Sequence, residues 1–195
     1  MNRRLRLTIA LAATFALSAC ASPRAPLVLD STLQPDEVDE VMVLPVIDAR
    51  PTPYELPQVA RNVGDAMVRF LRERGYFTIA AEGYATRPHD PIDLHVATAE
   101  QLVPLSPEDA KYFVLVQVEK IEPGVDATEQ VYDARLSAVM VDRPHSRVVW
   151  RDVATGSSTL GGVLTVFAKG SRQYEAAVNA SKLLVETLPD KRPKK

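Results

Sequence analysis

The chain is poor in the residues from which proteins build crosslinks and metal centres. It has one cysteine, Cys20, among 195 residues, so no disulfide can form within it. Its histidines, His89, His95 and His145, do not pair at the i, i+4 spacing of a zinc-binding helix. We therefore expect no metal site and no cofactor.

Neither sign of charge dominates, and long apolar runs are missing. Lysine and arginine number 23 against 25 aspartate and glutamate residues, a formal charge of −2. Removal of a leader carrying Arg3, Arg4 and Arg6 would leave the mature chain near −5. Such a surface does not suit nucleic acid, so no nucleic-acid partner is expected. The apolar stretch over residues 7–17 is shorter than the roughly 20 residues that a membrane-spanning helix requires.

Motifs for catalysis are missing as well. The sequence contains no Gly-x-Ser-x-Gly turn for a nucleophilic serine and no Gly-Lys-Ser/Thr ending for a phosphate loop. Two carboxylate pairs, Asp90 with Asp93 and Glu108 with Asp109, fall in regions expected to be loops. Charged loop residues are usually solvated surface. We therefore expect that the chain is not an enzyme.

The first twenty residues have the three-part order of a bacterial secretory leader. Arginines precede the apolar stretch 7–17, and small residues then lead to Cys20. The segment Leu17-Ser18-Ala19-Cys20 resembles a lipobox, the site at which bacterial lipoproteins are lipidated and cleaved. An ordinary signal peptide or an N-terminal membrane anchor is the alternative.

The lipobox resemblance implies a location as well as a modification. Residues 1–19 would be removed as a lipoprotein signal peptide, and Cys20 would carry acyl chains, palmitate among them. Two or more acyl chains anchor a protein stably. Ala21 follows the cysteine where inner-membrane lipoproteins carry aspartate, which favours the periplasmic face of the outer membrane. Lipidation would also remove the lone thiol from an oxidising compartment.

The remaining chain divides into three parts. Residues 20–40 hold prolines at 23, 26 and 35 and an acidic end, which predicts a lipidated cysteine followed by a flexible tether. Residues 41–188 predict a single periplasmic α/β domain. Residues 189–195 are a basic tail, interpreted either as a solvated end or as a weak contact with anionic lipid or cell-wall polymer.

The first half of the domain reads as a strand, a helix and a second strand. The apolar run 41–46 predicts a buried strand. Apolar residues at helical spacing predict a helix that begins at Pro57 and stops at Gly75. The run 76–80 predicts the next strand, so the three form a βαβ-type unit. Capping-box spacing at 98–101 and Ser-Pro-Glu at 106–108 predict two short helix starts.

The second half reads as strands followed by a helix. Strands are expected at 112–121, 130–142 and 147–155, the last two forming a hairpin. Alternation in 130–142 predicts one packed face and one solvent face. A helix is expected at 172–188. The fold class is therefore α/β (α+β), a mixed four- to five-stranded sheet with two main helices packed on one face.

A glycine-flanked apolar stretch precedes the last helix. Its side chains Val163, Leu164, Val166 and Phe167 either pack on the core beneath a loop or contact a partner, a second copy of the chain or the membrane.

The order of these segments resembles small envelope lipoproteins of the group that contains CsgG, LpoB and the N-terminal domain of TolB. The likeness covers roughly residues 40–188 and rests on loose motifs. These motifs are Val-Met-Val-Leu-Pro-Val at 41–46, Arg-Gly-Tyr-Phe at 74–77, the strand at 112–118 and Val-Val-Trp at 148–150. It implies a mixed sheet with helices on one side and no catalytic residues. Long amphipathic segments for a barrel pore are absent from the sequence.

Two functions follow as expectations. The first is an outer-membrane-anchored lipoprotein that acts without catalysis as a binding or assembly component of an envelope complex. Its partners would be the membrane, through the anchor, and envelope proteins, with self-association as a further expectation. The alternative is the auxiliary lipoprotein of an ABC-type lipid transport system. An envelope hydrolase is the weakest of the three hypotheses.

Overall fold

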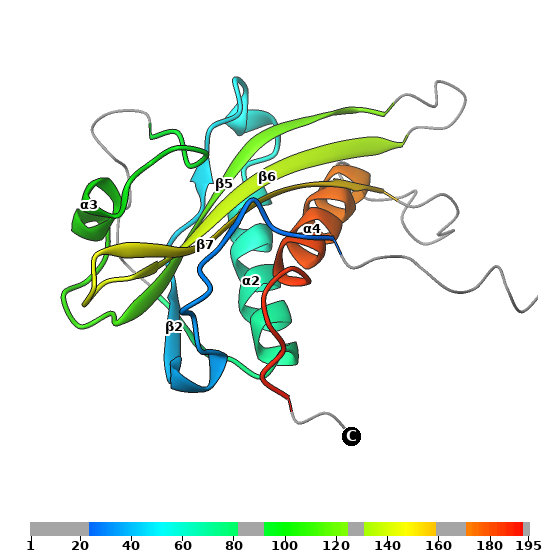
Figure 1. Ribbon diagram of the computed structural model, residues 1–195. Helices are drawn as coiled ribbons and strands as arrows, with labels where there is room; N and C mark the ends of the chain where they lie inside the picture. Colours follow the sequence, from blue (N-terminus) through cyan, green and yellow to red (C-terminus); the bar gives the residue numbers. More distant parts are fainter. Residues whose placement is uncertain (1–23, 82–91, 125–130, 159–170, 193–195) are drawn as a thin grey trace, which may run out of the picture.

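A seven-stranded mixed sheet forms the centre of the domain, with helices on both faces (Figure 1). The computed structural model describes residues 24–81, 92–124, 131–158 and 171–192. The sheet order is β1-β7-β6-β5-β2-β4, and the short β3 pairs with β5. The strands are β1 Val28–Leu29, β2 Glu40–Val43, β3 Ile47–Asp48, β4 Phe77–Ala80, β5 Tyr112–Pro123, β6 Tyr132–Asp142 and β7 Arg147–Ser157.

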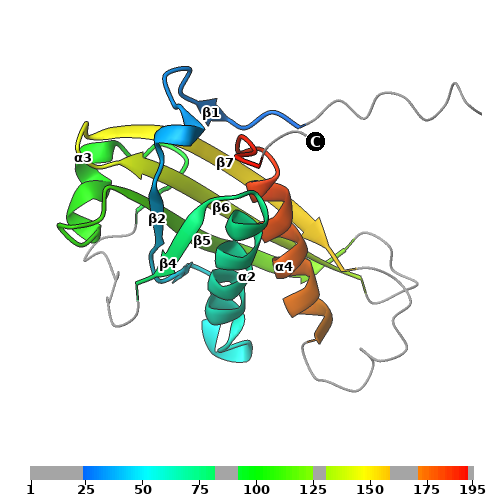
Figure 2. The same cartoon turned by 90° about the horizontal axis from the view of Figure 1, so that it is seen from below.

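Three α-helices and three 3-10 turns accompany the sheet in the described part of the chain. The helices are α2 Val59–Glu73, α3 Ala99–Leu102 and α4 Ser171–Val185. The 3-10 turns are η1 Pro35–Glu37, η2 Pro53–Glu55 and η3 Val103–Leu105. Both views place α2 and α4 over the same face of the sheet (Figures 1 and 2). Two helices, α2 and α4, therefore share one face of the sheet, and α3 is a third helix that the sequence-based fold class did not include.

The predicted βαβ unit is confirmed. Strands β2 and β4 are parallel neighbours, and α2 connects them. The helix begins at Val59, two residues later than predicted, and Pro57 lies in the preceding turn. Gly75 follows the helix with a φ of 88°, a left-handed conformation that residues with a Cβ rarely adopt. The first strand ends at Val43, two residues before Pro45.

The three long strands form an antiparallel meander, as the sequence predicts for the hairpin. Strand β6 pairs with β5 on one side and with β7 on the other. Even-numbered side chains of β6 from Ala134 to Met140 are buried against α2 and α4. The predicted solvent face is wrong for the second half of this strand, because Ser137, Val139 and Val141 are buried too.

A second hydrophobic core explains why Ser137, Val139 and Val141 are buried. Residues 92–105 cover the opposite face of the sheet near the β6–β7 turn (Figure 1). Leu94 and Leu102 are buried there against Phe113, Leu115 and Val139. The capping box at Thr98 and Gln101 is present and starts α3. The helix start predicted at 106–108 is wrong, since these residues form a turn after η3.

The predicted four to five strands are corrected to seven, and the helices to three. The extra strands, β1 and β3, have two residues each. Alternation over two residues produces no periodic signal, so neither strand could be distinguished from a loop.

Both ends of the described chain lie against the domain. Residues 24–40, which the sequence places in a tether, include β1, and Val28 pairs with Arg151 of β7. The guanidinium of Arg24 contacts the Asp152 carboxylate at 2.7 Å. At the other end the Lys191 ammonium donates to the Val38 carbonyl at 2.7 Å, so residues 189–192 follow the surface of the domain.

The contact of residues 189–192 with the domain depends on pH because it includes Tyr76. The side chain is buried, and its hydroxyl donates to the Pro189 carbonyl at 2.9 Å. Burial raises the pKa of Tyr76 to about 12, although the nearby Arg74 guanidinium opposes the shift. The neutral phenol is therefore favoured in the folded state, while an unfolded tyrosine ionises near pH 10.

We expect the free energy of unfolding to fall as pH rises from about 10 to about 12, by about 2 kcal/mol, since one pKa unit corresponds to about 1.4 kcal/mol. Below pH 10 the contribution is complete. Urea unfolding at about pH 9 and about pH 11.5 measures it, with Tyr76→Phe as the control that does not ionise. An equal loss in both proteins would show that Tyr76 does not cause it.

Candidate functional site

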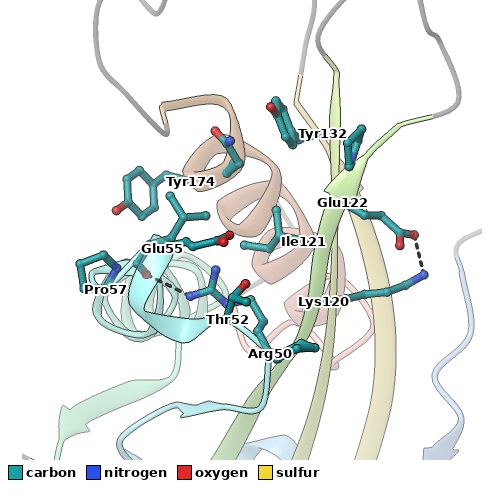
Figure 3. Close-up of a pocket in the computed structure, with 13 residues that line it drawn as sticks. Arg50, Thr52, Glu55, Pro57, Lys120, Ile121, Glu122, Tyr132 and Tyr174 are labelled. Atoms are coloured by element: carbon teal, nitrogen blue, oxygen red, sulfur yellow. Dashed lines mark hydrogen bonds and ion pairs between the residues drawn. The ribbon is translucent and has the colours of Figure 1, made fainter.

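An open cleft of about 960 Å³ lies between the η2 loop, the outer ends of β5 and β6, and the first turn of α4 (Figure 3). These segments are far apart in the sequence and meet only because α4 packs over the meander. The cleft is lined by Arg50, Pro51, Thr52, Glu55, Leu56, Pro57, Lys120, Ile121, Glu122, Pro123, Tyr132, Gln173 and Tyr174.

Arg50 fixes one wall of the cleft. Its guanidinium is buried and makes a two-pronged contact with Asp48, Nε to Oδ1 at 2.8 Å and Nη2 to Oδ2 at 2.7 Å. The same Nη2 donates to the carbonyls of Pro53 and Leu56. Paired, planar contacts of this kind hold arginine in a single geometry. Arg50 therefore shapes the η2 loop, and its charge is already neutralised by Asp48.

A second ion pair lies on the far side of β5 from Ile121 and Tyr174 (Figure 3). The Lys120 ammonium contacts the Glu122 carboxylate at 2.5 Å, and both side chains are about half exposed (49% and 51%). Exposed pairs of this kind contribute little to stability, typically about 0–1 kcal/mol. The pair therefore adds little to the stability of the domain, and both side chains point away from the space that Ile121 faces (Figure 3).

Aromatic and apolar side chains line the cleft itself. Tyr132 and Tyr174 lie on opposite sides of the opening, with Ile121 between them (Figure 3). All three are partly buried and pack on the core beneath α2 and α4. Tyrosine offers a large apolar surface with a polar tip, which suits contacts with a partner that is partly polar. The lining of the cleft offers contact area and a few polar groups.

A smaller apolar groove of about 390 Å³ lies beside α2 at the carboxyl ends of β2 and β4. Crevices outside the carboxyl ends of parallel strands are common ligand sites in open α/β sheets. Its lining is mainly aliphatic and comprises Val43, Leu44, Pro45, Val46, Ala60, Arg61, Gly64, Asp65, Val68, Ala80 and Ala81.

A polar cluster on the other face of the sheet holds residues 92–97 in place. Glu119 contacts the His95 Nε2 at 2.6 Å and the Arg135 Nε at 2.8 Å. Arg151 donates to the carbonyls of His95 and Ala97, and burial lowers the pKa of its guanidinium. These contacts account for the position of His95 without assigning a functional role to its side chain.

Comparisons with known proteins give no family. No family model matches the chain, and no curated protein matches it. Among solved structures, the PelC dodecamer from Paraburkholderia phytofirmans is similar at 15% identity and a TM-score of 0.49, covering 85% of this chain and 96% of PelC. A protein from Xanthomonas campestris is similar at 16% identity and a TM-score of 0.48, covering 83% of this chain and 91% of the Xanthomonas protein.

A third neighbour is a lipoprotein from Neisseria meningitidis, at 16% identity and a TM-score of 0.44, covering 61% of this chain and 82% of the lipoprotein. A minor lipoprotein from Acinetobacter baumannii is similar more loosely, at 10% identity and a TM-score of 0.37. The match covers 76% of this chain and 90% of that lipoprotein. Likeness at this level assigns neither a family nor a function. The resemblance to the group of CsgG, LpoB and TolB is not confirmed by these comparisons.

Several residues singled out in the sequence lie outside the described residues. They are Cys20, His89, Asp90, Val163, Leu164, Val166 and Phe167. Lipidation of Cys20 and contact through the stretch 163–167 remain predictions.

The other candidates do not come together as a site. Asp93 accepts the backbone N–H of His95, and His145 lies 2.9 Å from the Asp142 carboxylate. Glu108 and Asp109 are exposed in a turn. Within the described ranges, no three His, Cys, Asp or Glu side chains group closely enough to hold a metal ion. No helix in those ranges is long and apolar enough to span a bilayer.

The cleft itself was not predicted from the sequence. No sequence motif singles out Tyr132, Tyr174 or Arg50. Only the arrangement of β5, β6 and α4 shows that the three line one space.

Proposed function

We propose that this chain is a lipoprotein anchored to the periplasmic face of the outer membrane, where it acts without catalysis as a binding component of an envelope complex. The observation that carries the binding role is the cleft between η2, β5, β6 and α4. The anchor rests on the lipobox that ends at Cys20.

The size and lining of the cleft favour a segment of polypeptide as its occupant. Its volume of about 960 Å³ is at the upper end of the range for small-molecule pockets, about 300–1,000 Å³. Pro51, Pro57 and Pro123 stiffen its walls, so little conformational entropy is lost when a ligand binds. Two tyrosines flank an isoleucine, an arrangement that suits the apolar side chains of an extended segment.

The charges of the cleft support binding over proton transfer. Arg50 is held by Asp48, and Lys120 by Glu122. A general base or acid needs a group free to exchange a proton with the substrate. The polar tips of Tyr132 and Tyr174 instead provide hydrogen-bond partners for a polar backbone.

Site-specific crosslinking in intact membranes tests the cleft. A photoreactive residue at Glu55, which is exposed and lines the cleft, should crosslink to one defined envelope protein. The same residue at Glu100, exposed on α3 over the other face of the sheet, is the matched control. Tyr132→Ala combined with Tyr174→Ala should reduce the Glu55 crosslink by about tenfold or more, since interface tyrosines often contribute about 1–2 kcal/mol each.

Two outcomes would contradict the binding role of the cleft. One is a Glu55 crosslink that does not change when both tyrosines are truncated. The other is the same crosslinked product from positions 55 and 100, which would indicate random collision with the partner and not binding at the cleft.

The apolar groove beside α2 favours a second candidate, the auxiliary lipoprotein of an ABC-type lipid transport system. Its aliphatic lining at Val43, Val46 and Val68 suits an acyl chain better than a peptide backbone. Phospholipid that stays with the purified protein, together with a crosslink to a transporter subunit, would favour this candidate over an assembly role.

A further inference from the structure

Exposed apolar side chains gather along one edge of the domain. Among the described residues six large hydrophobic side chains are exposed, and five of them lie on or beside the β1–β7 edge. The sixth, Phe77, lies on β4 at the opposite edge of the sheet. The five are Leu27 at 61% exposure, Val28 at 37%, Leu29 at 43%, Val96 at 71% and Leu183 at 36%.

Strand pairing and hydrogen bonds bring these five residues together. Val28 is the pairing partner of Arg151. The Arg151 guanidinium donates to the carbonyls on both sides of Val96, which holds Val96 beside β7, the strand that pairs with β1. On the other face of the sheet, the Arg24 guanidinium donates to the Leu183 carbonyl at 3.1 Å. The last turn of α4 therefore completes the same edge (Figure 2).

Arg24 fixes the point from which the chain leads back to Cys20. Its Nη2 contacts the Asp152 carboxylate at 2.7 Å, and the Asp152 side chain is only 1% exposed. A buried carboxylate without its partner costs free energy, so the Arg24–Asp152 ion pair resists breaking. The first described residue is thus held at the apolar edge.

The covalent distance from Arg24 to the proposed anchor is short. Three residues lie between Cys20 and Arg24, so four Cα–Cα steps join them. A fully extended chain spans at most about 3.6 Å per residue, so the two Cα atoms are within about 14 Å of each other. An acylated Cys20 lies at the bilayer surface, and the apolar edge must then lie close to that surface.

We infer that the edge formed by Leu27, Val28, Leu29, Val96 and Leu183 rests on the phospholipid bilayer that holds the anchor. This inference rests on the proposed lipidation of Cys20. Charges beside the edge are paired, Arg147 with Asp30 and Lys182 with Glu186. Contact therefore depends on apolar burial in the interface and does not require anionic lipid.

The orientation determines where the cleft lies. Tyr174 lines the cleft near the start of α4, and Leu183 lies near its end. A rise of nine residue steps along the α-helix places them about 14 Å apart along the helix axis. With its last turn at the membrane, α4 points its first turn and the cleft toward the periplasm.

Fluorescence quenching in vesicles tests the inference on the full lipidated protein. Leu27→Cys, labelled with an environment-sensitive dye, probes the edge, and Phe77→Cys, equally exposed at 61%, is the matched control. With Cys20 acylated, the introduced cysteine is the only thiol. The vesicles contain phosphatidylethanolamine and phosphatidylglycerol, with a nitroxide on a fraction of the headgroups. The Leu27 label should be quenched by about half or more, as expected at the depth of the interface, and the Phe77 label should not.

The outcomes separate this inference from the proposed anchor. Protein that floats with vesicles but shows equal quenching at both labels overturns the orientation and leaves the anchor standing. Protein that does not float, or that floats equally after Cys20→Ser, overturns the anchor and the orientation with it. Self-quenching of the Leu27 label in detergent, rising with protein concentration, would show that a second copy covers the edge and would overturn the inference.

Discussion

Replacement of Gly156 by alanine should destabilise the domain by about 3 kcal/mol or more, at the upper end of the range for overpacked cores. Gly156 lies in β7, where α4 crosses the sheet. A Cβ at this position would lie 2.1 Å from the Ala180 backbone nitrogen and 2.7 Å from the Ala176 carbonyl oxygen. Backbone atoms cannot move aside as a flexible side chain can, so α4 would have to shift away from the sheet.

Gly64→Ala is the matched control. Gly64 lies in α2, and a Cβ there would meet only the Val46 Cγ2 atom, at an ordinary 3.6 Å. Alanine in place of a helical glycine should stabilise the domain by up to about 1 kcal/mol. Urea unfolding of the unlipidated mature chain, followed through the fluorescence of its single tryptophan, measures both variants. Equal stability of the two variants would contradict the close approach of α4 to β7.

Sequence patterns predicted the elements that are long and amphipathic. Helix α2 has apolar residues at helical spacing and a glycine stop, and the boundaries came within two residues at each end. Strands β5, β6 and β7 each contain 11 or more residues, enough for alternation and turn signals to be read. The parallel pairing of β2 with β4 follows from the connection through a helix.

Features that depend on distant contacts could not be predicted. Ser137 alternates as a surface residue would, yet it is buried, because residues 92–105 return to cover that face. The covering segment contains one short helix and little periodicity, so the sequence gives no sign of where it docks. Arg24 is likewise an ordinary basic residue in the sequence, and its role depends on Asp152 of β7.

The candidate site was less predictable than the fold. Tyr132 and Tyr174 are separated by the whole of β7 and by residues 159–170, and their types alone do not indicate a cleft. A binding surface without catalytic groups has no motif of fixed spacing. Such a surface forms only when distant segments pack together, and packing is the property that a single sequence specifies least directly.

Burial of Trp150 connects the sheet, the end of α4 and the apolar edge. The ring is fully buried beneath α4, and its Nε1 donates to the Thr187 hydroxyl at 3.0 Å. Thr187 lies 2.9 Å from the Asp152 carboxylate, which also holds Arg24. The tryptophan thus supports both the main core and the contact that fixes residue 24.

Trp150→Ala should cost about 3–5 kcal/mol of unfolding free energy, the usual range for removal of a large buried aromatic ring. Trp150→Phe keeps one aromatic ring and loses the N–H donor and part of the buried ring volume, so about 1–3 kcal/mol is expected. Urea unfolding followed by far-UV circular dichroism measures both, since the fluorescent probe is lost.

The two variants separate packing from hydrogen bonding. A cost for Trp150→Phe close to that of Trp150→Ala would locate the stabilisation in the Thr187 contact and not in the ring. A cost below about 1.5 kcal/mol for Trp150→Ala would contradict full burial of the side chain. Because Asp152 links this core to Arg24, we also expect Trp150→Ala to loosen the first described residues, seen as faster amide exchange at β1.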